Sequence, residues 1–216
     1  MLNKLIHFYV NKYLVSPFCQ QKYYLSYGFK HKILWYRNYK VASRTIDHIL
    51  REQEGKHGYI YSSQVGYLAK RYQKWFKFAF VRDPEERFVS GWKNLVLDRN
   101  YYKFSVEEHE KMKSLDHYIE WAEKFDKESC DEHLRSQYSL IDLENVDFIG
   151  KMEEFDRDFS YVAKEVGFEY KPIPKKNVSM SSPQKISQEQ KKKIKAMYLK
   201  DYQQFYPEKL KEGREK

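Results

Sequence analysis

The chain contains few cysteines, glycines and prolines. Its two cysteines, Cys19 and Cys130, are too few for a disulfide framework and show no metal-ligand spacing. Eight glycines and six prolines among 216 residues argue against long flexible linkers. No apolar run near the N-terminus reaches the ~18 to 20 residues of a membrane span, and no small-residue cleavage site follows. We expect a cytoplasmic protein, with a peripheral membrane contact by this segment as the alternative.

Aromatic and charged side chains are abundant instead. Aromatic residues make up 18% of the chain and charged residues 33%. Such a bulky, apolar composition is typical of a folded protein, and the length suits one large domain, or at most two small ones, with a sizeable core. We predict one domain over residues 1–216, with a basic and apolar N-terminal extension at 1–30 and a disordered tail at 207–216.

The net charge of +9 is unevenly distributed. Residues 1–105 carry 19 basic and 7 acidic side chains, residues 106–170 carry 8 and 19, and residues 171–216 carry 13 and 5. The acidic middle argues against a uniformly cationic surface, so we expect no nucleic-acid partner. The two basic regions favour convergence on one anionic ligand.

Short apolar runs alternate with stretches of helical periodicity. Strands are predicted at 32–36, 75–81 and 146–150. Asp83, Pro84 and Glu86 form a helix start, as N-cap, first helical residue and capping partner. Helices are predicted around 46–50, and at 84–98, 106–143, 155–166 and 188–205. This alternation predicts an α/β fold with a mostly parallel central sheet flanked by helices on both sides.

The loop after the first strand can bind an anion. Lys40, Ser43, Arg44 and Thr45 lie at the start of a helix, where backbone amides and the helix dipole favour phosphate or sulfate. The loop is no Walker A motif, because it lacks the glycines of that pattern. Taken alone, it is equally consistent with a surface loop whose hydroxyls cap a helix.

The loop after the second strand begins at Arg82. Open α/β sheets bind ligands at the carboxyl ends of their strands, and Ser90 follows in the next helix. The alternative is that Arg82 only forms an ion pair with Glu86 or Asp83. Two anion-competent loops after two parallel strands favour a ligand.

Four segments together resemble the Golgi-type carbohydrate sulfotransferases and their bacterial relatives. The sequence KVASRT at 40–45 resembles their 5′-phosphosulfate loop, and FAFVRDPEERFVSGW at 78–92 their 3′-phosphate motif. EHLRSQ at 132–137 with VDFIGKME at 146–153 and aromatic residues at 198–206 match further motifs. Three positions depart from the family: Tyr39 and Ser136 replace a common Pro, and Ala42 replaces a common Gly. The resemblance implies a P-loop nucleotide-kinase-like sulfotransferase fold and, without an anchor, a bacterial cytoplasmic protein.

The resemblance also implies a donor, 3′-phosphoadenylyl sulfate (PAPS), and a product, adenosine 3′,5′-bisphosphate (PAP). A saccharide, polysaccharide or glycolipid would be the acceptor, and no metal is required. Arginine and lysine suit such an anion, the first as a bidentate fork and the second as a compact charge. The donor-binding residues implied are Lys40, Ala42, Ser43, Arg44, Thr45, Arg82, Ser90, Lys176 and Asn177.

Two residues are candidates for the chemistry. Lys40 would stabilise charge on the leaving oxygen, since such transfers need alignment and charge stabilisation more than covalent help. His133, in the segment that resembles the family's histidine motif, would be the base for the acceptor hydroxyl. The alternative for His133 is an ordinary surface histidine between acidic neighbours. Glu153 and Asp158 match acidic family positions, or only anchor basic side chains.

Two other classes of protein compete with a sulfotransferase. One is a non-enzymatic binder of nucleic acid or acidic glycan that uses the basic regions, whose binding would depend steeply on salt. The other is a small-molecule P-loop kinase, which the missing Walker glycines disfavour.

Overall fold

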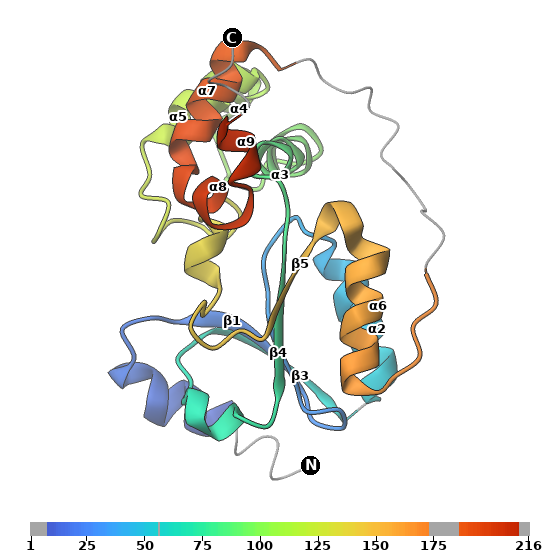
Figure 1. Ribbon diagram of the computed structural model, residues 1–216. Helices are drawn as coiled ribbons and strands as arrows, with labels where there is room; N and C mark the ends of the chain where they lie inside the picture. Colours follow the sequence, from blue (N-terminus) through green and yellow to red (C-terminus); the bar gives the residue numbers. More distant parts are fainter. Residues whose placement is uncertain (1–7, 56, 173–185, 212–216) are drawn as a thin grey trace. The chain divides into compact units, whose positions relative to one another are not determined.

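The computed structural model describes residues 8–55, 57–172 and 186–211. The chain divides into two compact units (Figure 1). Unit 1 comprises residues 1–81 and 137–172, and unit 2 comprises residues 82–136 and 173–216. The division falls between Val81 and Arg82, directly after a strand.

Unit 1 is built on a mixed five-stranded sheet in the order β3-β1-β2-β4-β5. The three predicted strands are confirmed as β2 (Ile33–Tyr36), β4 (Phe76–Val81) and β5 (Phe148–Lys151), which pair in parallel. Two further strands, β1 (Tyr23–Gly28) and β3 (Tyr59–Val65), pair antiparallel, β1 with β2 and β3 with β1.

The prediction of a mostly parallel sheet is therefore wrong, because half of the strand pairings are antiparallel. Only residues 29–32 connect β1 to β2, and a parallel crossover needs a dozen residues or more. All six residues of β1 are buried and three of them are tyrosine, so the strand lacks the alternation that marks a half-buried strand.

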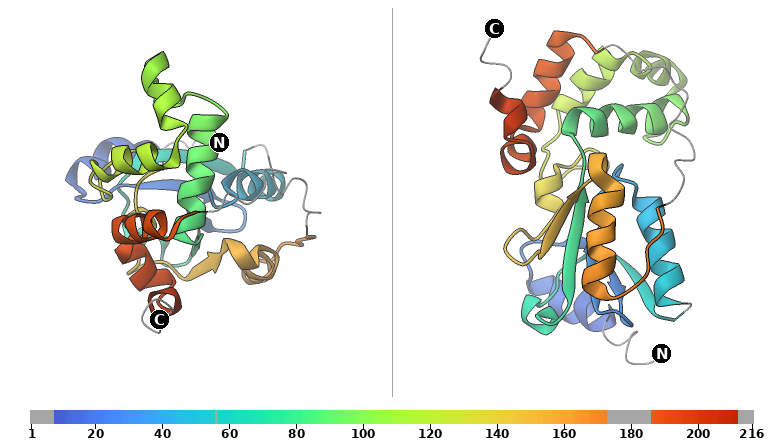
Figure 2. Two further views of the ribbon diagram at one scale, coloured as in Figure 1. Left: turned by 90° about the horizontal axis from the view of Figure 1, so that it is seen from above. Right: turned by 45° about the vertical axis from the view of Figure 1, so that its right-hand side comes forward.

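Two helices cover one face of this sheet. Figures 1 and 2 show α2 (Ser43–Glu54) and α6 (Phe155–Val166) side by side on it. Trp35, Phe78 and Phe80 of the strands pack there against the apolar stripes of both helices. The helix predicted at 155–166 is confirmed, and it ends at Gly167, which has a left-handed backbone conformation.

The opposite face carries a cluster of tyrosines. Strand residues alternate between faces, so Tyr27 and Tyr36 point away from Trp35. The hydroxyl of Tyr67 donates a 2.7 Å hydrogen bond to Asp142 and also bonds to the hydroxyl of Tyr36. Three short helices belong to unit 1 as well: η1 (Val10–Val15), η2 (Ser16–Phe18) and η3 (Ala69–Tyr72). Residues 10–28, expected as part of an extension, thus contribute η1, η2 and β1.

A buried carboxylate fastens the turn between β1 and β2 to the end of α2. Glu54 Oε2 accepts a 2.7 Å hydrogen bond from the Lys30 amide, and Oε1 accepts from the amide and ring of His31 at 3.2 and 2.8 Å. A Cβ at Gly28 would lie 2.7 Å from the Glu54 carboxyl carbon. The absence of a side chain at Gly28 therefore makes room for this contact.

We expect Glu54→Ala to lower the free energy of unfolding by about 2 to 4 kcal/mol, because the amides of Lys30 and His31 and the His31 ring all lose their acceptor. Glu52→Ala on the same helix is the control. Glu52 is exposed, and its pairing with His48 predicts an effect under about 0.5 kcal/mol. Urea unfolding measures both, and equal effects would contradict the role of Glu54.

Unit 2 is helical in its described part. The predicted helix start is confirmed, because the Asp83 carboxylate accepts a 2.9 Å hydrogen bond from the Glu86 amide. Helix α3 (Pro84–Trp92) continues as the π-helical η4 (Lys93–Leu97). The core of the unit gathers apolar side chains from α3, η4, α5 and α7, with Phe88, Tyr118 and Tyr198 at its centre. The remaining helices are α4 (Val106–Met112), α5 (Leu115–Glu123), α7 (Gln188–Met197), α8 (Leu199–Phe205) and α9 (Glu208–Lys211).

The prediction of one helical stretch over 106–143 is wrong beyond Glu123. The Lys127 ammonium donates to the carbonyls of Ala122 and Phe125, which closes the end of α5, and Asp126 accepts hydrogen bonds in the following turn. The helix predicted at 188–205 is interrupted at Tyr198. Residues 207–211, expected in the tail, include α9, whereas residues 212–216 lie outside the described residues.

Candidate functional site

The loop between β2 and α2 has an unusual backbone conformation. Lys40 and Ala42 have φ angles of +67° and +57°, in a region that non-glycine residues rarely adopt. Asn38 is fully buried and donates a 2.8 Å hydrogen bond to the Phe80 carbonyl, which ties the loop to β4. Strained conformations persist only where the surrounding structure enforces them, and they cluster at functional sites. The surrounding structure therefore fixes the conformation of this loop, which is not a flexible surface connection.

The start of α2 presents unused hydrogen-bond donors. The Ala42 carbonyl accepts from the amides of Thr45 and Ile46, whereas those of Ser43 and Arg44 have no backbone partner within the described residues. The side chains of Ser43, Arg44 and Thr45 likewise make no hydrogen bond or ion pair in this part of the structure. The first turn of α2 contains no acidic residue. Open amides, hydroxyls and the positive helix end together suit an anion.

We expect Ala42→Gly to stabilise the protein by about 1 kcal/mol, because glycine adopts the left-handed conformation without a Cβ clash. For a chain of this length that raises the Tm by roughly 2 to 4 °C. Ala196→Gly, on the exposed surface of α7, is the control and should destabilise by up to about 1 kcal/mol. Calorimetry of both variants should show a higher Tm for Ala42→Gly and a lower Tm for Ala196→Gly. A lower Tm for Ala42→Gly would contradict strain at this position.

Arg82 lies in unit 2, immediately before α3. Its Nε and Nη2 atoms lie 3.3 and 3.2 Å from Glu86 Oε2, so the predicted ion pair with Glu86 is present. The Glu86 side chain is 52% exposed, and exposed pairs contribute little. Asp83, by contrast, is buried and accepts a 2.8 Å hydrogen bond from Lys209. Ser90 is half-buried on α3.

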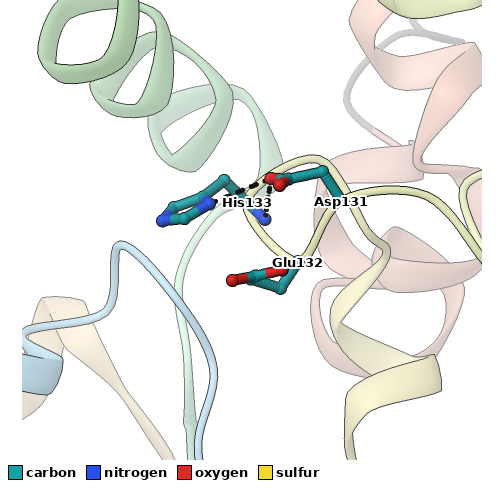
Figure 3. Close-up of side chains that lie close together, drawn as sticks. All are labelled: Asp131, Glu132 and His133. Carbon is teal, nitrogen blue, oxygen red and sulfur yellow. Dashed lines mark hydrogen bonds and ion pairs between the residues drawn. The ribbon is translucent and has the colours of Figure 1, made fainter. Parts of the chain in front are cut away.

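His133 lies in the loop between α5 and η5 (Gln137–Leu140) and pairs with Asp131. The Asp131 Oδ1 atom is 2.9 Å from both the backbone amide and the ring Nδ1 of His133. Dashed lines in Figure 3 mark these contacts. The imidazole packs edge-on against Tyr101, with ring centres 4.8 Å apart. A carboxylate at Nδ1 favours the tautomer in which Nδ1 donates and Nε2 accepts. The contact with Asp131 thus orients the His133 ring.

Neighbouring elements of unit 2 hold this loop. Arg87 of α3 donates a 3.2 Å hydrogen bond to the Glu132 carbonyl, and the Tyr198 hydroxyl donates to the Leu134 carbonyl at 2.8 Å. The Ser136 amide donates to the Lys127 carbonyl at 2.7 Å. A proline at 136, common in the family, has no N–H for this bond. The departure at Ser136 therefore has a structural reason here.

Asp131, Arg87 and Tyr101 were not predicted from the sequence as site residues. The available signal was an aspartate two residues before a histidine, which allows an Asx-type contact with its backbone amide. Arg87 and Tyr101 gave no local signal, because their role depends on tertiary packing.

Asp131, Glu132 and His133 also present ligand atoms within 4.8 Å of one another, a grouping that can hold a cation. Asp131 Oδ1 and His133 Nδ1 already satisfy each other, however. We therefore interpret the pair as a hydrogen-bonded dyad.

The contact between Asp131 and His133 makes the free energy of unfolding depend on pH. Burial works to raise the pKa of Asp131, but hydrogen bonds from the ring and amide of His133 outweigh it and hold the pKa below its usual value of 3.8. A depressed carboxyl pKa stabilises the fold above the unfolded-state pKa, and this contribution is lost as the pH falls through the folded-state pKa.

We expect Asp131→Asn to make the free energy of unfolding depend less on pH at acidic pH. Guanidinium unfolding between about pH 5 and pH 3 should show the wild type losing stability more steeply than the variant. Asp98→Asn, at an exposed position, is the control. Parallel curves for wild type and Asp131→Asn would contradict the depressed pKa.

The structure gives less information on the other residues that were considered for the site. Lys176 and Asn177 lie outside the described residues. Asp158 accepts hydrogen bonds from the Lys151 amide and from Arg157 Nε at 2.7 and 2.9 Å, which is the anchoring alternative considered for it. Glu153 is exposed.

Unit 1 holds Lys40, Ala42, Ser43, Arg44 and Thr45 on one loop and helix start. Unit 2 holds the other predicted residues that the structure describes, namely Arg82, Ser90 and His133. The action of the two groups on one donor stays a prediction.

A strained loop with open amide donors at a helix start suits an anion, and a histidine that a carboxylate orients suits a general base; both features are typical of α/β enzymes that transfer a charged group. The chain belongs to the sulfotransferase family, whose model matches residues 3–207. The resemblance is thus confirmed at the level of the family, and sulfuryl transfer is the activity of that family. No curated protein and no solved structure matches the chain.

Proposed function

We propose that the protein transfers a sulfuryl group from PAPS to a hydroxyl of a carbohydrate or glycoconjugate. The observation that carries the proposal is the start of α2, where free amides and hydroxyls follow a strained loop. The acceptor class, a saccharide, polysaccharide or glycolipid, rests on the motif resemblance, as do the bacterial origin and the cytoplasmic location.

The donor would be held by two sets of residues. The amides of Ser43 and Arg44, with the hydroxyl of Thr45, suit the 5′-phosphosulfate, and Arg82 with Ser90 suits the 3′-phosphate. The connectivity supports this assignment, since β2 and β4 are parallel neighbours and their carboxyl ends share one edge of the sheet. The first loop follows β2, and Arg82 is the next residue after β4.

The chemistry would divide between a cation and a base. PAPS, when bound, supplies the activated sulfuryl group for an in-line displacement, and PAP is the product. Lys40 would neutralise the negative charge that develops on the leaving oxygen. Asp131 holds the His133 ring so that Nε2 accepts the proton of the acceptor hydroxyl. None of these roles uses a metal ion.

Thermal unfolding with PAP tests the donor site. At a concentration a hundred times the Kd, a ligand adds about 2.7 kcal/mol of stability. That corresponds to a rise in Tm of roughly 5 to 10 °C for a chain of this length. ADP, which lacks the 3′-phosphate, is the control and should give a smaller shift. An unchanged Tm at millimolar PAP would contradict the proposal.

Sulfate-labelled donor, offered with a panel of sugars, polysaccharides and glycolipids, tests the acceptor class. Labelling of a carbohydrate hydroxyl is the expected result. Donor binding without labelling of any class would contradict the transfer to carbohydrate and leave the donor site intact. Salt-sensitive retention on DNA or acidic glycan that ignores Lys40→Ala would support the non-enzymatic binder instead.

A further inference from the structure

Two short segments of unit 1 gather exposed apolar side chains. Tyr9, Tyr13, Leu14 and Phe18 lie in and beside η1 and η2, and Leu68 directly precedes η3. These five are among the eleven large apolar side chains exposed in the described part of the chain, and Phe18 is 88% exposed. Single exposed apolar residues need no explanation, but a cluster of them marks an interaction site.

The two segments lie side by side, as Figures 1 and 2 show for η1 and η3. The buried Asn11 side chain donates hydrogen bonds to the hydroxyls of Tyr72 and Tyr27 at 2.6 and 3.2 Å. The hydroxyl of Ser16 accepts from the Gly66 amide at 2.7 Å. Polar side chains of the N-terminal segment thus fasten it to the rest of unit 1, while Tyr9, Tyr13, Leu14 and Phe18 are exposed to solvent.

The same surface is basic. Residues 8–22 and 68–74 contain no aspartate or glutamate. The Lys12 ammonium lies 5.3 Å from the ring centre of Tyr13 and 5.6 Å from that of Phe8. Lysine stems commonly cover apolar surface in this way while the ammonium stays in water. Five exposed cations belong to the two segments: Lys12, Lys22, Lys70, Arg71 and Lys74.

We propose that this basic-aromatic surface binds an anionic lipid bilayer. Aromatic and leucine side chains enter the headgroup region, and the cations contact acidic headgroups. A lysine-rich surface fits lipid better than a second copy of the chain, because lysine is depleted in protein–protein interfaces. The contact is interfacial, since none of the helices in the described residues has the length and apolar character to cross a bilayer. It does not depend on the proposed catalytic function.

Co-sedimentation of the whole chain with vesicles tests the proposal. Vesicles of equal parts phosphatidylcholine and phosphatidylglycerol should sediment the protein, and vesicles of phosphatidylcholine alone should not. Leu14→Ser with Phe18→Ser should weaken the partition by about tenfold or more, because two apolar side chains no longer enter the bilayer. Lys12→Gln and Lys70→Gln should each weaken it about fivefold.

Val106→Ser on α4 is the matched control, since Val106 is 82% exposed on unit 2, outside the surface. It should sediment like the wild type, and circular dichroism confirms that each variant is folded. Equal sedimentation of the wild type and Leu14→Ser/Phe18→Ser would overturn the proposal. So would a concentration-dependent dimer that these substitutions dissociate, in a protein that no vesicle sediments.

Discussion

Arg82→Ala should lower the affinity for PAP by about two orders of magnitude. A charge-assisted hydrogen bond contributes about 1.5 to 3 kcal/mol, and arginine can offer two to one phosphate. Arg82 is the residue directly after β4, and open α/β folds bind ligands outside the carboxyl ends of their strands. Isothermal titration calorimetry with PAP measures the effect. The affinity for adenosine 5′-phosphate, which lacks the 3′-phosphate, should change much less.

Two further variants test whether a loss of PAP affinity is specific to Arg82. Arg157→Ala removes an arginine whose side chain is 67% exposed on α6, where it pairs with Asp158, and should leave PAP binding unchanged. Glu86→Gln removes the carboxylate that pairs with Arg82, so the affinity for PAP should rise a few-fold. If Arg82→Ala binds PAP as tightly as the wild type, Arg82 is only the ion-pairing residue of the structural alternative.

His133→Ala should slow sulfuryl transfer by about a hundred- to ten-thousandfold while leaving PAP binding intact. General-base catalysis by a positioned imidazole is typically worth that much. The structure orients the ring through Asp131, with Nε2 as the accepting atom. Single-turnover transfer at saturating donor and acceptor measures the chemical step apart from binding.

Among the histidines, His117 is the matched control because it lies exposed on α5 of the same unit. His117→Ala should retain the wild-type rate. Asp131→Asn should slow the transfer as well, because the contact that orients the ring through Nδ1 is altered. A wild-type rate in His133→Ala would show that another residue takes the proton.

Local patterns were enough to predict β4 and the start of α3. Continuous hydrophobicity in β4 and the Asp83-Pro84 start of α3 are short-range signals, and both are present in the structure. Family membership was also accessible, because the order and spacing of four motifs are properties of the chain itself. Local signals failed where partners are distant. The antiparallel pairing of β1 with β3 depends on contacts that no short window contains. The end of α5 is different, because the Lys127 ammonium bonds to the nearby Ala122 carbonyl, a local contact that hydrophobic periodicity does not reveal.

The candidate site residues likewise combine features that the sequence predicts with features that depend on folding. The sequence by itself determined which residue types were available: Lys40, two hydroxyls and Arg44 at a helix start, and a histidine in a recognisable segment. Only the tertiary structure decided the backbone conformation of the loop and the orientation of the histidine ring. The tie from Asn38 to Phe80 accompanies a left-handed conformation at Lys40 and Ala42, and Asp131 and Arg87 position His133 and its loop. Backbone strain and ring orientation are enforced by packing between distant segments, so they become visible only once the chain has folded.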